Sequence, residues 1–369
     1  MKATFPHLAH LNVVLEVLYP ALGIEVIPPP PITKKTIEIG VKLAPQNACF
    51  PMKVTLGNFI EGIEKGADTI FMAGGVGPCR FGYYGQIQRI IIEDLGYDVN
   101  FVLIDFPRYG WKNFFSSLKV MIGGKWSISR VHHAVRLAWN VLRYVEDLEK
   151  ISRKVRWKLE SPSQLDALIE ESLKEVKKIN SIAQLEEIRS NTLYEISQLN
   201  ILEKKEPIKI GIVGEVYIAQ EFRVNFNIEK LLGNMGVLVD NSVSTVEYIL
   251  NFFPFTRSRE KEEAWELAKP YLKRFIGGEG IDTVGNTIRY AKQGYDGVIH
   301  LYPFTCMPEA VAKSIVTGVG RDYNIPILHL AIDEHAGEAG MITRVEAFVD
   351  VLEMRHKQDV REASHSLNE

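Results

Sequence analysis

Cysteine is scarce in this sequence, with only three among 369 residues: Cys49, Cys79 and Cys306. An odd number of thiols spread over the whole chain argues against a disulfide framework. The three are also too far apart to form the Cys-x-x-Cys pairs of zinc ribbons and ferredoxins. On number alone, they are as compatible with buried structural cysteines as with a functional site.

Long apolar runs and an excess of charge are lacking as well. No run approaches the ~18 residues that a membrane-spanning helix needs, and the formal net charge is −3, so we expect neither a membrane nor a nucleic-acid partner. Residues 1–6 lack the apolar core of a signal peptide, which makes the cytoplasm the expected location. The strand and turn at 208–217 contain neither Gly-x-Gly-x-x-Gly nor Gly-x-x-x-x-Gly-Lys, so no dinucleotide or ATP fingerprint is found.

Alternating strand and helix patterns are present instead. The apolar run 68–73 predicts a buried parallel strand, and 86–95 predicts a helix after a glycine- and proline-rich turn that carries Cys79. The segment 294–309 repeats this order, with Cys306 in its turn. The sequence therefore predicts two α/β units of similar build, each presenting one cysteine at the edge of its sheet.

The length of the chain exceeds the roughly 250–300 residues at which a single core usually divides, so we expect two or three domains. Region 1–110 is predicted to be an α/β domain carrying the first two cysteines, and 207–369 a second one carrying the third. Strand signals vanish in 111–206, which predicts a helical insertion that bridges the two α/β units or supplies a dimer surface. In the second domain, charged residues at 260–275 predict an exposed helix. The expected fold class is α/β, with two Rossmann-like (flavodoxin-like) parallel-sheet domains and a helical insertion.

The positions of the cysteines are more informative than their number. Each lies in a turn, has a proline within two residues and precedes a predicted helix, which for Cys49 begins near Lys53. Ligands bind to α/β sheets at the carboxyl ends of strands, and the dipole of a helix N-terminus favours the thiolate that binds metals. Rigid turns that carry thiols are more typical of ligand binding than of core packing.

Three kinds of chemistry fit these thiols. Cys306 with His335 as its base would form a nucleophilic pair, and three cysteines with His300 or His335 would form a zinc site. Three thiolates can also hold an iron–sulfur cluster, and because a [4Fe–4S] cube takes four ligands, one iron would stay open to substrate. Lys53 and Arg80, each close in sequence to a cysteine, would then bind the cluster, offset the thiolate charge and tune the potential. The alternative is that either residue is simply a surface charge.

The loop 333–340 combines acids, one histidine and small residues between a predicted strand and the last helix. Its His335 and Glu338 are candidate catalytic proton donors, since reduction of a substrate consumes protons as well as electrons. The alternative is that these residues only stabilise the N-terminus of the helix that follows.

Five segments carry a family resemblance, the most specific being Gly-Pro-Cys-Arg-Phe-Gly-Tyr-Tyr. They are 30–36, 47–53, 77–84, 214–217 and 333–340. Together they resemble the 2-hydroxyacyl-CoA dehydratase/benzoyl-CoA reductase superfamily, most closely its activase-related and double-cubane-cluster branch. The resemblance implies Rossmann-like domains and an oxygen-sensitive iron–sulfur cluster, [4Fe–4S] or a sulfide-bridged double cubane, on Cys49, Cys79 and Cys306. It also implies a separate ATP-hydrolysing iron–sulfur activator as the partner that supplies low-potential electrons.

We therefore expect a homodimeric iron–sulfur reductase or dehydratase-type component that reduces a small-molecule substrate at an open iron. The alternative is a non-catalytic electron-transfer or cluster-carrying subunit of an acyl-CoA dehydratase-type complex.

Overall fold

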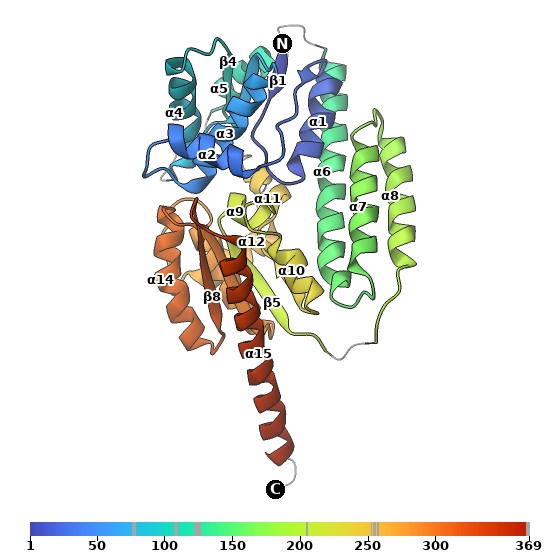
Figure 1. Cartoon of the computed structure of the whole chain (residues 1–369), viewed down its shortest axis with the longest axis vertical. Coiled ribbons are helices and arrows are strands. Elements are labelled where there is room, and N and C mark those ends of the chain that lie inside the picture. Colours follow the sequence, from blue (N-terminus) through green and yellow to red (C-terminus); the bar gives the residue numbers. More distant parts are fainter. Residues whose placement is uncertain are drawn as a thin grey trace. The chain divides into compact units, whose positions relative to one another are not determined.

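The computed structural model describes residues 1–75, 79–106, 110–121, 127–203, 206–251, 253, 256 and 258–366. The chain forms two compact units, whose elements can be followed in Figure 1. The first unit is Met1–Glu149, Ser163–Leu199 and Ser244–Ser258; the second is Lys150–Pro162, Asn200–Val243 and Arg259–Glu369. In the described part of the chain, no helix is both long and apolar enough to cross a membrane.

The first unit is built around four parallel strands in the order β2-β1-β3-β4. They are β1 (Lys2–Thr4), β2 (Glu25–Val26), β3 (Thr69–Ala73) and β4 (Asn100–Ile104). The chain moves from β1 to one side and then crosses to β3 on the other, so the direction of winding reverses between β1 and β3. In doubly wound folds, ligands bind outside the carboxyl ends of the strands at such a switch point.

Both faces of this sheet are buried. Phe71 of β3 packs on Tyr19 of α1 (Leu11–Leu22), with ring centroids 5.1 Å apart. Ile70 and Met72 point to the opposite face, where they pack with Phe59 of α3 (Phe50–Glu64), because successive side chains of a strand alternate. The other helices of this part are α2 (Lys34–Leu43), α4 (Phe81–Asp94) and α5 (Trp111–Met121).

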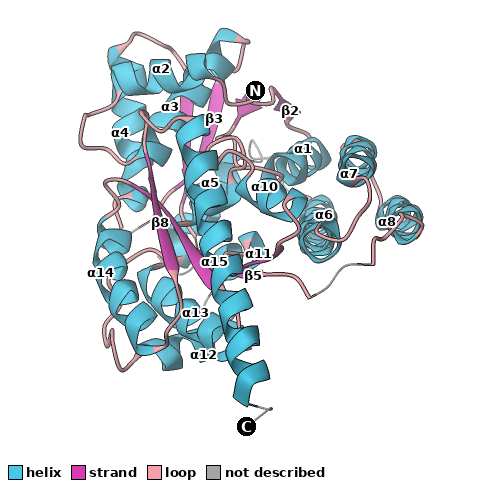
Figure 2. Cartoon of the chain, turned by 60° about the horizontal axis from the view of Figure 1, so that its bottom comes forward, coloured by secondary structure: helices cyan, strands magenta, loops and turns pink. Residues whose placement is uncertain are grey.

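The middle of the chain is helical. Helices α6 (Ile128–Arg156), α7 (Pro162–Val176) and α8 (Ile182–Ser197) lie side by side (Figures 1 and 2). Their buried side chains include Leu137 and Tyr144 of α6, Leu165 of α7 and Leu185 of α8. The hydroxyls of Tyr144 and Ser172 are hydrogen-bonded at 2.6 Å, which joins α6 to α7. The predicted helical insertion is thus present.

The second unit repeats the strand arrangement of the first, with four parallel strands in the order β6-β5-β7-β8. Its switch point lies between β5 and β7, and every residue of β7 is buried. The strands are β5 (Lys209–Gly214), β6 (Leu238–Asn241), β7 (Gly297–Pro303) and β8 (Ile327–Ile332). The helices are α9 (Val216–Gln220), α10 (Ile228–Asn234), α12 (Arg259–Ala268), α13 (Gly280–Lys292), α14 (Met307–Asp322) and α15 (Glu338–Ser366), while α11 (Thr245–Leu250) belongs to the first unit.

The predicted fold class, two Rossmann-like parallel sheets with a helical insertion, is confirmed. The predicted helix at 260–275 is too long, however, because α12 ends at Ala268. Pro270 explains this end, since proline lacks the N–H that a continuing helix needs and disfavours helical backbone in the residue before it.

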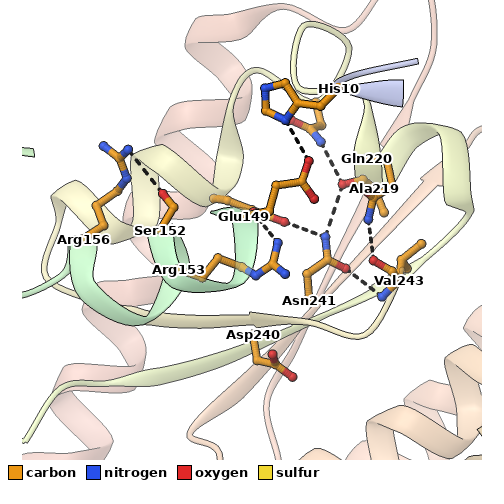
Figure 3. A network of polar contacts seen from close by, with 12 residues as sticks. His10, Glu149, Ser152, Arg153, Arg156, Ala219, Gln220, Asp240, Asn241 and Val243 are labelled. Atoms are coloured by element: carbon orange, nitrogen blue, oxygen red, sulfur yellow. Dashed lines mark hydrogen bonds and ion pairs between the residues drawn. The ribbon is translucent and has the colours of Figure 1, made fainter. Parts of the chain in front are cut away.

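A polar network fixes the end of β6 in the second unit. The side-chain amide of Asn241 donates to the carbonyl oxygen of Ala219 at 3.3 Å and to Glu229 Oε1 at 2.6 Å, and its oxygen accepts from the N–H of Val243 at 2.9 Å (Figure 3). The other oxygen of Glu229 accepts from Arg153 Nη1 at 3.1 Å. The side chain of Arg153 is only 7% exposed, so this ion pair is largely withdrawn from water.

The Arg153→Met variant is expected to lower the free energy of unfolding by about 2 kcal/mol. Methionine keeps much of the apolar stem but leaves the carboxylate of Glu229 with only part of its hydrogen bonding. Urea denaturation measures the change. Lys357→Met is the matched control, because its pair with Glu353 is exposed and should contribute less than about 0.5 kcal/mol. Equal losses in the two variants would contradict the structural role of Arg153.

Candidate functional site

Two of the three cysteines lie at adjoining helix starts in the first unit. Cys49 is the buried N-cap of α3, and Pro51 follows it in the first turn of that helix. Cys79 follows β3 and directly precedes Arg80, the N-cap of α4. Its own neighbour Pro78 lies outside the described residues. All three cysteines are described, and none forms a disulfide bond.

One face of α4 joins these two turns. Arg80 Nη1 donates to the carbonyl oxygen of Asn47 at 2.9 Å, and the hydroxyl of Tyr84 is hydrogen-bonded to Cys49 Sγ. Gln88 Nε2 donates to Thr55 Oγ1 at 2.7 Å on α3. Arg80, Tyr84 and Gln88 are spaced by four residues and therefore share one face of the helix. The turns of Cys49 and Cys79, thirty residues apart in sequence, are held next to each other.

Two features near Cys49 would stabilise a thiolate there, while burial of the sulfur opposes one. Burial, and next the nearby Cys49, raise the pKa of Tyr84 far above its ordinary value, so Tyr84 stays a neutral phenol that is able to donate a hydrogen bond to the sulfur. The helix dipole of α3 acts in the same direction. Lys53 is buried one turn after Cys49, and Arg80, which is exposed, directly follows Cys79. Each thiol-bearing turn therefore has a cation close by in sequence.

Cys306 takes the equivalent place in the second unit. It is the buried N-cap of α14, just after β7, and its N–H donates to the carbonyl oxygen of Pro303 at 2.9 Å. The neighbouring strand β5 ends at Gly214, whose φ of +138° and close approach to Leu301 exclude a side chain. The next residue, Glu215, then caps α9 by accepting from the N–H of Ile218 at 3.0 Å. Cys306 and Glu215 thus flank the switch point of this sheet.

His335 and Glu338 follow β8 at the same edge of the second sheet, because β7 and β8 are parallel neighbours. The N–H of His335 donates to Asp333 Oδ1 at 2.9 Å, and Glu338 is the first residue of α15. Both side chains are exposed. The position of Glu338 suits a carboxylate that stabilises a helix N-terminus. Proton donation by either residue stays a prediction.

The sequence patterns indicated His300 only as a possible zinc ligand and missed the buried set of titratable groups to which it belongs. His300 of β7 is fully buried, and its two ring nitrogens are hydrogen-bonded to Glu309 Oε2 at 2.8 Å and to His329 Nδ1 at 3.0 Å. Because both nitrogens are used, His300 does not offer a zinc ligand in this arrangement. The signal for the contact with His329 is the pairing of β7 with β8, which puts these two residues opposite each other.

Two carboxyl groups near this set have raised pKa values. Burial raises the pKa of Glu215 to about 7, opposed by the N–H groups of Ile218 and Tyr217 and reinforced by Glu309. Burial first and Glu215 next raise the pKa of Glu279 well above its usual range. Glu279 is the N-cap of α13, so acids from three segments gather near the carboxyl edge of this sheet.

Among the residues that the structure describes, no three His, Cys, Asp or Glu side chains form a group able to hold a metal ion. The two joined cysteine turns belong to the first unit, and Cys306 belongs to the second. Convergence of all three sulfurs stays a prediction.

The comparisons with known proteins concern the first unit. Residues 8–74 match the family model described as the CoA enzyme activase uncharacterised domain, and no curated protein matches the chain. The matched segment runs from α1 through β3, so it includes Cys49 and Lys53 and ends before Cys79. Over these residues, the chain is similar to a domain linked to CoA-enzyme activases.

Proposed function

We propose that this protein is an iron–sulfur reductase or dehydratase-type component that receives low-potential electrons from a separate ATP-hydrolysing activator. Its substrate is a small molecule, and its cluster is held by Cys49, Cys79 and Cys306. The observation that carries the proposal is the joining of two thiol-bearing helix starts by Arg80 and Tyr84. The match of residues 8–74 to an activase-linked domain supports the same class of protein.

The donor set fits an iron–sulfur cluster. Thiolates are the usual ligands of such clusters, and all three cysteines lie at helix starts, where the thiolate form is favoured. When bound, a cluster with three protein ligands supplies low-potential electrons and one iron with an open position. The residues of the chain then have separate tasks: Tyr84 donates a hydrogen bond to Cys49, and Lys53 and Arg80 offset thiolate charge.

Protons for the reaction come from the carboxyl edge of the second sheet. His335 and Glu338 are the exposed candidates there. A homodimer is part of the proposal, and two copies of the chain contain the six thiolates that a sulfide-bridged double cubane would use. The helices of the middle segment are the proposed dimer surface.

The second candidate function is a non-catalytic electron-transfer or cluster-carrying subunit of an acyl-CoA dehydratase-type complex. It is favoured by the same match, because the description of that family model names CoA enzyme activases and no dehydratase. A cluster whose absorption spectrum changes on addition of small unsaturated substrates supports the reductase. A cluster that passes electrons but whose spectrum does not respond to small unsaturated substrates supports the carrier.

Anaerobic purification followed by iron and sulfide analysis tests the proposal. About four irons and four sulfides per chain are expected, because three thiolates suffice for one cube with an open iron. Native mass spectrometry of the dimer then distinguishes two separate cubes from a double cubane, which carries one additional sulfide. Reduction by an ATP-dependent activator is the functional readout. Protein that contains zinc or no metal under these conditions would exclude both candidate functions.

A further inference from the structure

A continuous line of hydrogen bonds runs through the second unit from an exposed residue to a fully buried carboxyl group. His329 Nε2 lies 3.2 Å from Thr317 Oγ1, and His329 Nδ1 lies 3.0 Å from His300 Nδ1. His300 Nε2 lies 2.8 Å from Glu309 Oε2, which also accepts from Thr283 Oγ1 at 3.0 Å. Thr317 is exposed, His329 is half-buried, and His300 and Glu309 are 0% exposed.

The fold directs this line to the edge that carries Cys306. His300 and His329 are paired across β7 and β8, so the line crosses from one strand to the next. Glu309 lies in the first turn of α14, three residues after Cys306. The line therefore connects the outer side of β8 with the start of the helix at the switch point.

The positions of the hydrogens follow from the partners at the outer end. Thr317 Oγ1 donates its only hydrogen to the carbonyl oxygen of Lys313 at 2.9 Å, so toward His329 it can only accept. His329 then carries its hydrogen on Nε2, and it is neutral because burial, His300 and Lys313 lower its pKa to about 4. Its Nδ1 therefore accepts, and His300 donates from Nδ1. One proton is left to be shared between His300 Nε2 and Glu309 Oε2.

The surroundings place this shared proton on Glu309. Among the described residues, Glu309 Oε1 has no hydrogen-bond partner although it is fully buried. An ionised carboxylate with such an oxygen would be costly in the interior. The ring of Tyr302 stacks on that of His300, with ring centroids 4.5 Å apart.

We propose that His329, His300 and Glu309 form a proton relay whose outlet is the unpartnered Oε1 of Glu309 at the Cys306 edge. When Oε1 takes up a proton, Oε2–H passes to His300 Nε2, and the Nδ1 proton of His300 passes to His329 Nδ1. The Nε2 proton of His329 then leaves to solvent. Delivery is the reverse and starts from this second state: His329 takes up a proton at Nε2, its Nδ1 proton moves to His300 Nδ1, the Nε2 proton of His300 moves to Oε2, and Oε1–H goes to the small-molecule substrate of the proposed function. No electrons move in either direction.

The relay itself is tested in the metal-free protein. The infrared carbonyl band of protonated Glu309, assigned by its loss in Glu309→Gln, shifts when O–H is replaced by O–D. After rapid dilution into deuterated buffer, we expect His329→Ala to slow this shift about a hundredfold, the size of effect that positioned proton-transfer groups have. Added imidazole should restore the rate. His356→Ala is the control, because His356 pairs with Asp296 at the surface and lies outside the line.

Three results would overturn the relay: a band absent at neutral pH, an unchanged rate in His329→Ala, or a slowed rate that imidazole does not restore. His329→Gln serves if the alanine variant does not fold, since an amide fills the space but cannot pass a proton. The use of the relay in catalysis rests on the proposed function. In protein loaded with iron and sulfide, His329→Ala should lower turnover and leave metal content unchanged, again with rescue by imidazole.

The two proposals fail in distinguishable ways. Absence of iron and sulfide in the wild-type protein would reject the proposed function, while the exchange experiment would still decide the relay. Normal turnover in loaded His329→Ala, together with slowed exchange, would reject the use of the relay in catalysis and leave the cluster in place.

Discussion

The Gly57→Ala variant is expected to lose about 4 kcal/mol of stability, a large fraction of the roughly 5–15 kcal/mol that stabilises an ordinary protein. A Cβ on Gly57 would lie 2.0 Å from the carbonyl oxygen of Thr36, and one on Gly40 would lie 1.8 Å from the carbonyl oxygen of Lys53. Helices α2 and α3 therefore meet backbone to backbone, and neither contact can be relieved by turning a side chain. Overpacking typically costs about 1–3 kcal/mol. Here the added Cβ meets a backbone carbonyl of the neighbouring helix, so the expected loss lies above that range.

Thermal and urea unfolding measure the loss, with Gly318→Ala as the matched control. Gly318 is also helical, in α14, but nothing lies within 4 Å of the added Cβ. Alanine is the better helix former, so the control should be neutral or more stable by up to about 1 kcal/mol. A Gly57→Ala protein as stable as the control would mean that α2 and α3 can separate without cost. Because α3 begins at Cys49, the variant also tests whether this packing positions the first thiol.

Local signals in the sequence were sufficient for most elements of the fold. The start of α2 is an example: threonine is a residue type that favours the N-cap position, and the side chain of Thr33 accepts from the N–H of Thr36 there. The positions of the cysteines at helix starts were predictable for the same reason, because glycine, proline and the change of period act over a few residues. Strand β1 was missed, since Lys2–Thr4 is too short for any period to show.

The contacts that define the candidate site depend on tertiary structure and could not be predicted in this way. Tyr84 looks like a residue of an amphipathic helix, and only the packing of α4 on α3 brings its hydroxyl to Cys49. His300 lies in a run of apolar residues, and its pairing with His329 requires the register of β7 and β8. Cys49 and His329 each lie far more than one helical turn away in sequence from the residue they contact. The periodicity of the sequence therefore carries no information about these two contacts.

The Cys79→Ser variant is expected to lose its iron while keeping its fold. Cys79 is half-buried in a turn held by β3 and α4, so the thiol adds little packing, but a serine hydroxyl is a poor ligand for iron–sulfur clusters. Even outer partners of metal sites change metal affinity by about 10–100-fold, so loss of a direct ligand should exceed that. Iron and sulfide after anaerobic reconstitution are the measurement, with circular dichroism to check the fold.

Two further variants show which unit holds the cluster. Tyr84→Phe is the matched control: it keeps the ring but removes the hydrogen bond to Cys49, so iron binding should weaken by about tenfold and not disappear. If one cluster uses all three thiols, Cys306→Ser should lose as much iron as Cys79→Ser. Full retention of iron in Cys306→Ser would confine the metal to the two joined turns of the first unit. Full retention in Cys79→Ser would reject these turns as ligands altogether.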